Sequence, residues 1–471
     1  MHTRIYWVIL SAILCLFSFS LSVTGTIAQS KASKIDSLLQ VAHQRGFFNG
    51  NALVAEKGTI VYQNDIGYAD ADRNRTLNSD LRFSIGSISK EFDGVALMLL
   101  AQQGLLSLDD SLQDYMPELP DWSQNIRLTH LLQYTSGIPS PGVGVLRSDD
   151  AVHNYLQMVD SLSFEPGSAY NYNNIDVFLR KKVVEAASGK QYNQFITDRI
   201  LVPCGMSTAV IDATPDTPRM AFSFDNYFTP DVLDITTTGW VFVTTEDIYR
   251  WTQCLHSGEL LHSEYLAQLF ETHSASTQSP LGRAVYSNED FIFQYHHGQL
   301  DNFEASLYVN RPEEFTILLL TNNRNSNVGD LRTAIDAILR GEPFEIPKKS
   351  IEMTLRTEIL YNGYEQGLAL FREILETERD IFDFDNEENE LIETGEYLIL
   401  KDKIEDAIGL LTFTANRFPQ SSAAATKLGN AYLQSGQPDL ARQSFELALV
   451  HKEDNEEAME AMRRLATEGR E

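Results

Sequence analysis

Two hydrophobic periods occur in the N-terminal part of the chain, and each predicts a different element. From Gly50 to Tyr68 apolar and polar positions alternate, which predicts a β-hairpin with its turn at Lys57-Gly58. A helical spacing follows Lys90 and comprises Phe92, Val95, Ala96, Leu99 and Leu100. This spacing predicts a helix with one buried face, which ends near Gly104.

A second strand-rich block lies much later in the chain. Apolar residues predict strands at 291–295 and 303–323, the latter interrupted by a turn at Arg311-Pro312-Glu313-Glu314. A short helix is expected from Lys34 to Ala42, and helical patterns fill the region between the two strand blocks. The predicted fold class is therefore α+β, with one antiparallel sheet flanked by helices and a helical cluster supplied by the middle of the domain.

The pattern changes between Arg340 and Ser350, where glycine, proline and lysine indicate a linker. Beyond it almost every segment reads as helix, including a final one at 458–465. A shift of 34 residues superimposes two sets of small and apolar positions, namely Gly395, Ala407, Leu411 and Thr414 on Gly429, Ala441, Phe445 and Ala448. This region resembles tetratricopeptide helical pairs.

The predicted domains follow from these boundaries. A first folded domain is expected at 29–345, a linker at 346–355 and an all-α tetratricopeptide-like domain at 356–471. Such helical pairs need neighbours to bury their apolar faces. Both a peptide-binding groove and a stabilising appendage fit the pattern.

The N-terminus carries the features of an export signal. Arg4 precedes an apolar run from Ile5 to about Val23, and the small residues of Thr26-Ile27-Ala28 precede Gln29. This predicts a signal peptide at 1–28 and a secreted or periplasmic protein of the bacterial cell envelope. An uncleaved membrane anchor is the alternative, because the apolar run is long enough to span a bilayer.

Charge and cysteine content narrow the partners further. The chain has 37 Lys and Arg against 66 Asp and Glu, a formal net charge of −29, which argues against nucleic acid and anionic membrane surfaces as partners. Cys204 and Cys254 lie in apolar surroundings, and we expect two buried free thiols, although export would permit one bridge. Neither is a catalytic candidate.

The strongest chemical signal is Ser87-Ile88-Ser89-Lys90. A serine and a lysine three residues apart lie on the same side of a helix, about one turn apart. Lysine can take the serine proton only if burial or nearby positive charge lowers its pKa from about 10.4. Taken alone, the motif is weak evidence, because it occurs by chance in many helices and a helix N-cap serine followed by a solvated lysine is then the better explanation.

Two further elements follow in chain order. Tyr172-Asn173-Asn174 comes after a Pro-Gly turn, and His296-His297-Gly298 lies between two strand-like segments. An ordinary turn and helix cap would explain the first, and a surface histidine pair would explain the second. No His or Cys partner stands at zinc-ligand spacing, so we expect no metal site.

Ser-x-x-Lys, Tyr-x-Asn and His-x-Gly in this order resemble the serine β-lactamase and penicillin-binding-protein superfamily. The closer resemblance is to its class C-like branch of D,D-peptidases, esterases and related serine hydrolases. Leu-Thr-His-Leu-Leu-Gln-Tyr-Thr-Ser-Gly at 128–137 and Thr-Thr-Glu-Asp-Ile-Tyr-Arg-Trp at 244–251 are similar to further stretches of that family. The resemblance covers about residues 35–340 and agrees with the predicted fold.

The resemblance implies a catalytic group of three residues. Ser87 would be the nucleophile that becomes acylated, and Lys90 would take or relay its proton. Tyr172 would need cationic neighbours, Lys90 above all, to act as a phenolate-like base, because a phenol normally ionises near about 10. No metal or organic cofactor is implied.

The resemblance also implies the substrate-binding groups. Asn174 would orient the lysine and the substrate amide, and His296, on an edge strand, stands where many relatives have lysine. Gly298 would leave the strand edge clear for substrate. The backbone N–H groups of Ser87 and Gln299 would form the oxyanion hole.

Two departures from the family pattern bear on specificity. The largely neutral imidazole of His296 replaces an ammonium group, which weakens carboxylate recognition and favours ester, amide or small peptide substrates. Asp301 and Asn302 follow where many relatives have a second glycine, and they narrow or charge that end of the cleft.

The sequence therefore predicts an exported serine hydrolase that acts through an acyl-enzyme on an ester, amide or D-amino-acid peptide bond. Its partners would be a small-molecule or peptide substrate and, through the helical repeats, a second protein. The alternative is a non-catalytic envelope binding or scaffold protein that uses the same fold and the repeats.

Overall fold

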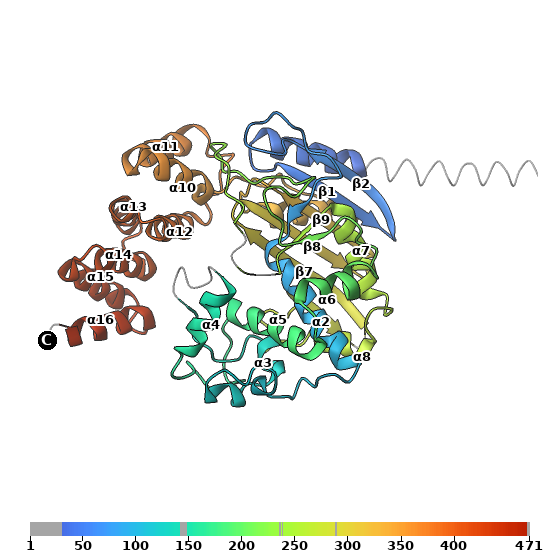
Figure 1. Cartoon of the computed structure of the whole chain (residues 1–471). Coiled ribbons are helices and arrows are strands. Elements are labelled where there is room, and N and C mark those ends of the chain that lie inside the picture. Colours follow the sequence, from blue (N-terminus) through green and yellow to red (C-terminus); the bar gives the residue numbers. More distant parts are fainter. Residues whose placement is uncertain (1–30, 142–147, 235–236, 238, 288–289, 469–471) are drawn as a thin grey trace, which may run out of the picture. The chain divides into compact units, whose positions relative to one another are not determined.

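Figure 1 shows a computed structural model of the chain, which describes residues 31–141, 148–234, 237, 239–287 and 290–468. The predicted signal peptide at 1–28 lies outside these residues. The chain divides into two compact units. The N-terminal unit reaches Ile346, and the C-terminal unit begins at Pro347 and includes the short segments Asp225–Tyr227 and Asn325–Asn327. No helix among the described residues is long and apolar enough to cross a membrane.

The N-terminal unit is built on a six-stranded antiparallel sheet with the order β2-β1-β9-β8-β7-β6. Both predicted strand blocks contribute to it, and the turns at Lys57-Gly58 and Arg311–Glu314 are confirmed. The strands are β1 (Gly50–Glu56), β2 (Thr59–Ile66), β6 (Arg283–Ser287), β7 (Asp290–Leu300), β8 (Phe303–Asn310) and β9 (Phe315–Thr321).

The strand that carries His296 is not the edge strand, which corrects the prediction. β6 pairs with the first half of β7 and forms the edge, and its pairing ends where Arg283 lies opposite Tyr295. β6 has only five residues, too few for its alternation to be recognised in the sequence. The second half of β7, from His296 to Leu300, extends beyond the β6 register.

Helices cover both faces of the sheet. Because successive strand residues face opposite sides, β1 and β9 supply apolar side chains to two separate cores and are almost fully buried. One core packs against the helical residues 31–44 and α9 (Val328–Arg340). The other packs against α2 (Lys90–Gln102), α5 (Asn174–Ser188) and α7 (Thr245–His256), as Figure 1 shows.

Shorter elements complete the unit. A three-stranded sheet has the order β3-β5-β4, and η1 (Gly86–Ser89) is a 3-10 turn that leads directly into α2. The remaining elements are β3 (Phe83–Ser84), β4 (Val210–Ile211), β5 (Val241–Val243), η2 (Leu112–Asp114), η3 (Asp121–Asn125), α3 (Leu128–Leu132), α4 (Asp149–Gln157), α6 (Tyr192–Ile196), the π-helical η5 (Thr197–Leu201) and α8 (Ser263–Gln268).

The helix predicted after Lys90 is confirmed as α2, and it ends as its sequence indicates. Gly104 adopts a φ of +69°, which favours glycine, and its N–H donates to the Ala101 carbonyl oxygen. All of its residues from Lys90 to Leu100 are buried, because the helix lies inside the larger core rather than on its surface.

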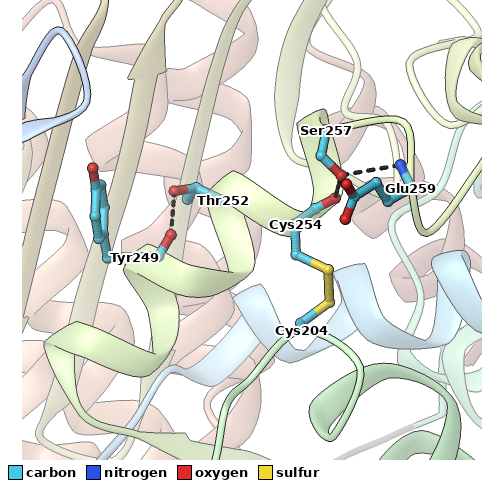
Figure 2. The surroundings of a disulfide bond; sticks show 6 residues. All are labelled: Cys204, Tyr249, Thr252, Cys254, Ser257 and Glu259. Atoms are coloured by element: carbon cyan, nitrogen blue, oxygen red, sulfur yellow. Dashed lines mark hydrogen bonds between the residues drawn. A yellow bond between two sulfur atoms is a disulfide. The ribbon is translucent and has the colours of Figure 1, made fainter.

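Cys204 and Cys254 form a disulfide bond, so the prediction of two free thiols is wrong (Figure 2). Their Cα atoms are 5.3 Å apart, although 50 positions separate them in the sequence. Cys254 lies in α7, and Cys204 follows the π-helical turn that ends at Leu201. The apolar surroundings of both cysteines predicted burial but carried no information about their proximity in space.

The C-terminal unit is all-helical, as predicted. Its helices are α10 (Ile351–Asn362), α11 (Tyr364–Thr377), α12 (Glu387–Leu400), α13 (Ile404–Arg417), α14 (Ser422–Gln434), α15 (Pro438–His451) and α16 (Glu456–Glu468). A Cβ on Gly395 would lie 2.6 Å from the Leu411 side chain, and one on Gly429 would lie 2.6 Å from Phe445. The same close helix approach thus recurs after 34 residues. Its assignment to tetratricopeptide repeats stays a prediction.

Candidate active site

Ser87 and Lys90 lie together at the start of α2. Ser87 belongs to η1 rather than to the helix itself, and Lys90 is the first residue of α2. Lys90 Nζ donates to Ser87 Oγ at 2.9 Å, and the Lys90 side chain is almost fully buried. Burial lowers the pKa of Lys90 to about 7, although the nearby Asp93 carboxylate opposes this change. Near neutral pH about half of the Lys90 amines are therefore unprotonated and able to take a proton.

A buried ion pair lies beneath the lysine. Asp93 Oδ1 is 2.5 Å from Arg180 Nε, and both side chains are fully buried. Arg180 also donates to the Tyr134 hydroxyl and to the Leu131 carbonyl oxygen. The guanidinium charge helps to hold the pKa of Lys90 down. The sequence analysis missed this pair. Asp93 and Arg180 each stand among the apolar residues of a helix, and this could have indicated a buried ion pair.

Tyr172 also reaches Ser87. Its hydroxyl donates to Ser87 Oγ at 3.2 Å, and its ring centroid is 5.1 Å from Lys90 Nζ. Removal of the phenol from water raises the pKa of Tyr172, and the Arg180 charge offsets this only in part. The hydrogen bond to Ser87 also lowers the pKa of Tyr172, and the role of its phenol as a base stays a prediction.

The two asparagines that follow Tyr172 lie in different surroundings. Asn173, the middle residue, is the N-cap of α5: its side chain accepts from the Ile175 N–H at 2.9 Å and donates to the Ile138 carbonyl oxygen. Asn174 lines a cavity of about 150 Å³ together with Lys90 and Asp93. Asn174 makes no hydrogen bond to Lys90 in the described part of the chain, so its orienting role stays a prediction.

Two glycines allow β7 to contact the turn η1, which contains Ser87. A Cβ on Gly298 would overlap the Ile85 carbonyl oxygen and would lie 2.9 Å from the Ser87 nitrogen. A Cβ on Gly86 would overlap the backbone of Gln299, and Gly86 also has a φ of +50°. This contact places the backbone nitrogen of Gln299 against Gly86 and that of Ser87 against Gly298, and their role as an oxyanion hole stays a prediction. Sequence reasoning assigned Gly298 to substrate clearance and missed Gly86.

His296 is buried and does not stand alone. Its Nδ1 is 2.8 Å from Glu91 Oε1, and Glu91, the residue after Lys90, is fully buried in α2. Glu91 also accepts hydrogen bonds from Gln294 and from the Trp251 indole. Sequence reasoning missed Glu91, whose signal was a carboxylate on the apolar face of α2.

Among the described residues, no cluster of three or more His, Cys, Asp or Glu side chains has the arrangement of a metal site. The groups around Ser87 are its own hydroxyl, an amine whose pKa is lowered by burial, a phenol and the neighbouring backbone of Gln299. A nucleophile with an adjacent base suits acyl transfer.

The family model described as Beta-lactamase matches residues 32–341. Penicillin-binding protein 4* of Bacillus subtilis (strain 168) is 24% identical over 357 residues, which cover 68% of this chain and 79% of that protein.

Two solved structures share the fold of this region. A penicillin-binding protein from Bacillus halodurans superimposes with a TM-score of 0.57 at 21% identity, over 64% of this chain and 99% of its own. The D-amino acid amidase of Ochrobactrum anthropi SV3 superimposes with a TM-score of 0.56 at 18% identity, over 66% and 99%.

Proposed function

Since the chain belongs to the Beta-lactamase family, we propose that it is an exported serine hydrolase that works through an acyl-enzyme on an ester, amide or D-amino-acid peptide bond. The observation that carries this proposal is the hydrogen bond between Ser87 and a buried Lys90 whose pKa is lowered to about 7. A base with its pKa near the working pH is the most effective proton acceptor.

Acylation uses the groups around Ser87. The neutral Lys90 amine takes the hydroxyl proton as Ser87 Oγ forms a bond to the substrate carbonyl carbon. The carbonyl oxygen becomes an oxyanion between the N–H groups of Ser87 and Gln299, each worth about 3 kcal/mol in such a site. The bond to the leaving alcohol or amine then breaks, and that group takes the proton, relayed from Lys90 through the Tyr172 phenol.

Deacylation reverses the roles with water. Lys90, neutral again, takes a proton from water, whose oxygen attacks the acyl carbon. The bond to Ser87 Oγ breaks and the proton returns to Ser87. Every proton is thus returned and no oxidant, metal or organic cofactor enters the balance.

Substrate class follows from His296 and from the relatives. The Glu91 carboxylate lies 2.8 Å from His296 Nδ1, and its negative charge behind the ring opposes the binding of a substrate carboxylate, which favours esters, amides and small peptides over acidic β-lactams. The matched proteins are named as a penicillin-binding protein and a D-amino acid amidase. Together with the predicted signal peptide, this supports a role in the bacterial cell envelope, outside the cytoplasm.

The proposal is tested by covalent labelling and turnover. We expect the purified chain to react with a fluorophosphonate probe and to hydrolyse an activated p-nitrophenyl ester faster than nitrocefin. Ser87→Ala is expected to lose both labelling and turnover. Thr245→Ser, at the buried first residue of α7 and outside the site, is the folding control. Labelling that persists in Ser87→Ala would show that another residue is the nucleophile, and ligand binding without any product would favour the scaffold alternative.

A further inference from the structure

Glu91 lies at the centre of a buried polar cluster directly behind the proposed nucleophile and base. Its carboxylate is fully buried at the start of α2, next to Lys90. Three N–H groups reach it, from Trp251 Nε1 at 2.7 Å, Gln294 Nε2 at 2.7 Å and His296 Nδ1 at 2.8 Å. A buried carboxylate needs such a full set of donors, because an unpaired one would be strongly destabilising.

The donor set fixes the state of the imidazole. The Trp251 indole can only donate, and a carboxylate can only accept, so Glu91 acts as the acceptor at both oxygens. His296 Nδ1 must then carry its hydrogen. In the neutral ring this leaves Nε2, on the far side of the ring from Nδ1, as an acceptor.

The cluster is held rigidly from three elements. Trp251, in α7, stacks on Phe92 with ring centroids 4.4 Å apart. Gln294, in β7, is fully buried and contacts His256 Nε2 at 3.0 Å through its Oε1. The titratable group in contact with His296 is Glu91, and His256 lies beyond Gln294. Burial lowers the pKa of His256 to about 4, so it stays neutral at pH 7.

Given the proposed hydrolase function, on which this inference rests, we infer that Glu91 is a positioning residue for His296 and a determinant of substrate class. It fixes the imidazole as the Nδ1–H tautomer and makes the site selective for acyl donors that carry no carboxylate beside the scissile bond. Carboxylates that hold an imidazole in one tautomer are a recurrent device in hydrolases. Here the same carboxylate also places negative charge behind the ring, which repels an acidic substrate.

The chain contains a matched control for this pair. The next residue of β7, His297, pairs with Glu304, with Nε2 2.8 Å from Oε1, and Glu304 is also buried. Because side chains alternate along a strand, His297 points to the opposite face of β7 from His296. Glu304→Gln therefore makes the same chemical change to a His–Glu pair outside the proposed site, although the His297 side chain is 35% exposed.

The test compares two esters that differ only in a carboxylate on the acyl group. In Glu91→Gln we expect kcat/KM for the neutral ester to fall about tenfold or more, as for other groups that orient a functional histidine. The ratio of kcat/KM for the acidic ester to that for the neutral ester should rise roughly fivefold or more. Glu304→Gln should leave both quantities within about twofold of the parent.

A double-mutant cycle separates positioning from a purely structural effect. In a His296→Gln background the further change Glu91→Gln should alter kcat/KM by less than about twofold, because its route of action has been removed. Equal losses in both backgrounds, or an unchanged ester ratio, would overturn the inference. Labelling of Ser87 in the same samples tells these outcomes apart from a failure of the proposed function.

A spectroscopic measurement keeps the inference testable if Glu91→Gln does not fold. In the parent protein labelled with ¹⁵N-histidine, the His296 signal, assigned by its loss in His296→Gln, should show a protonated Nδ1 and an unprotonated Nε2 above the pKa of the ring. The opposite tautomer would contradict the assignment.

Discussion

Replacing Lys90 by methionine should abolish activity and at the same time stabilise the fold. The pKa of Lys90 falls from 10.5 to about 7, because the ammonium loses its water on burial. Since about half of the folded lysines still carry the proton at pH 7, this corresponds to roughly 4 kcal/mol of folding free energy lost at that pH. Methionine has a similar length and no charge to bury, so Lys90→Met recovers part of this energy.

The pH dependence of this gain has a definite sign. Between pH 7 and 10.5 the unfolded state binds the Lys90 proton and the folded state does not, so the stability of the parent rises with pH. At pH 9 the remaining loss is roughly 2 kcal/mol, from the 1.5 units left below 10.5. The advantage of Lys90→Met should therefore shrink by roughly 2 kcal/mol between pH 7 and pH 9. Burial, and to a smaller extent the charge of Lys90, lowers the pKa of Lys181 to about 8, so this lysine also makes the stability of the parent rise with pH.

Urea unfolding at pH 7, 8 and 9, followed by tryptophan fluorescence, measures this difference. The matched control is Lys182→Met, since ion pairs to Asp149 and Glu185 raise the pKa of Lys182 instead. That variant should be slightly less stable than the parent, with no gain at pH 7. A Lys90→Met variant that is less stable than the parent, or whose advantage does not depend on pH, would refute the reasoning about a desolvated lysine.

Three further results are expected. The kcat/KM for an activated ester should rise with pH with a midpoint near 7, as neutral Lys90 accumulates, and a rate that is flat from pH 5 to 9 would argue against Lys90 as the base. Peptide mapping without reductant should recover Cys204 joined to Cys254, and free thiols at both positions would contradict the bridge. In a Cys204→Ser/Cys254→Ser variant the free energy of unfolding should fall by about 4 kcal/mol, because the unfolded chain gains entropy. In Gly298→Ala, the rate of ester hydrolysis should fall about a hundredfold or more, because the new Cβ would overlap the Ile85 carbonyl oxygen. The control is Gly329→Ala, whose Cβ would meet only the Tyr295 hydroxyl, at 3.2 Å, and which should stay active. Similar activity in both variants would show that β7 does not need this contact.

The elements that could be predicted from the sequence are those whose signal is local. The hairpin of β1 and β2, the end of α2 at Gly104 and the change to helices after Ser350 each follow from periodicity or a single turn residue. The three motifs in this order indicated the family and hence the fold, because three short patterns in series are specific together although each is weak alone.

What could not be predicted depends on contacts between distant segments. Glu91 reads as one polar residue on an apolar helix face, and only the approach of β7 and α7 shows that it binds His296 and Trp251. The Asp93–Arg180 pair likewise joins two helices far apart in the chain. The disulfide was missed for the same reason, and the pKa of Tyr172 depends on enclosure that no motif encodes.

Mass spectrometry of the purified chain, acid-quenched during turnover of a slow ester substrate, tests the acyl-enzyme most directly. The account predicts a mass increase equal to one acyl group, mapped to the peptide that contains Ser87 and absent from Lys90→Met. Steady product release with no acyl adduct, or an adduct on any residue other than Ser87, would contradict it.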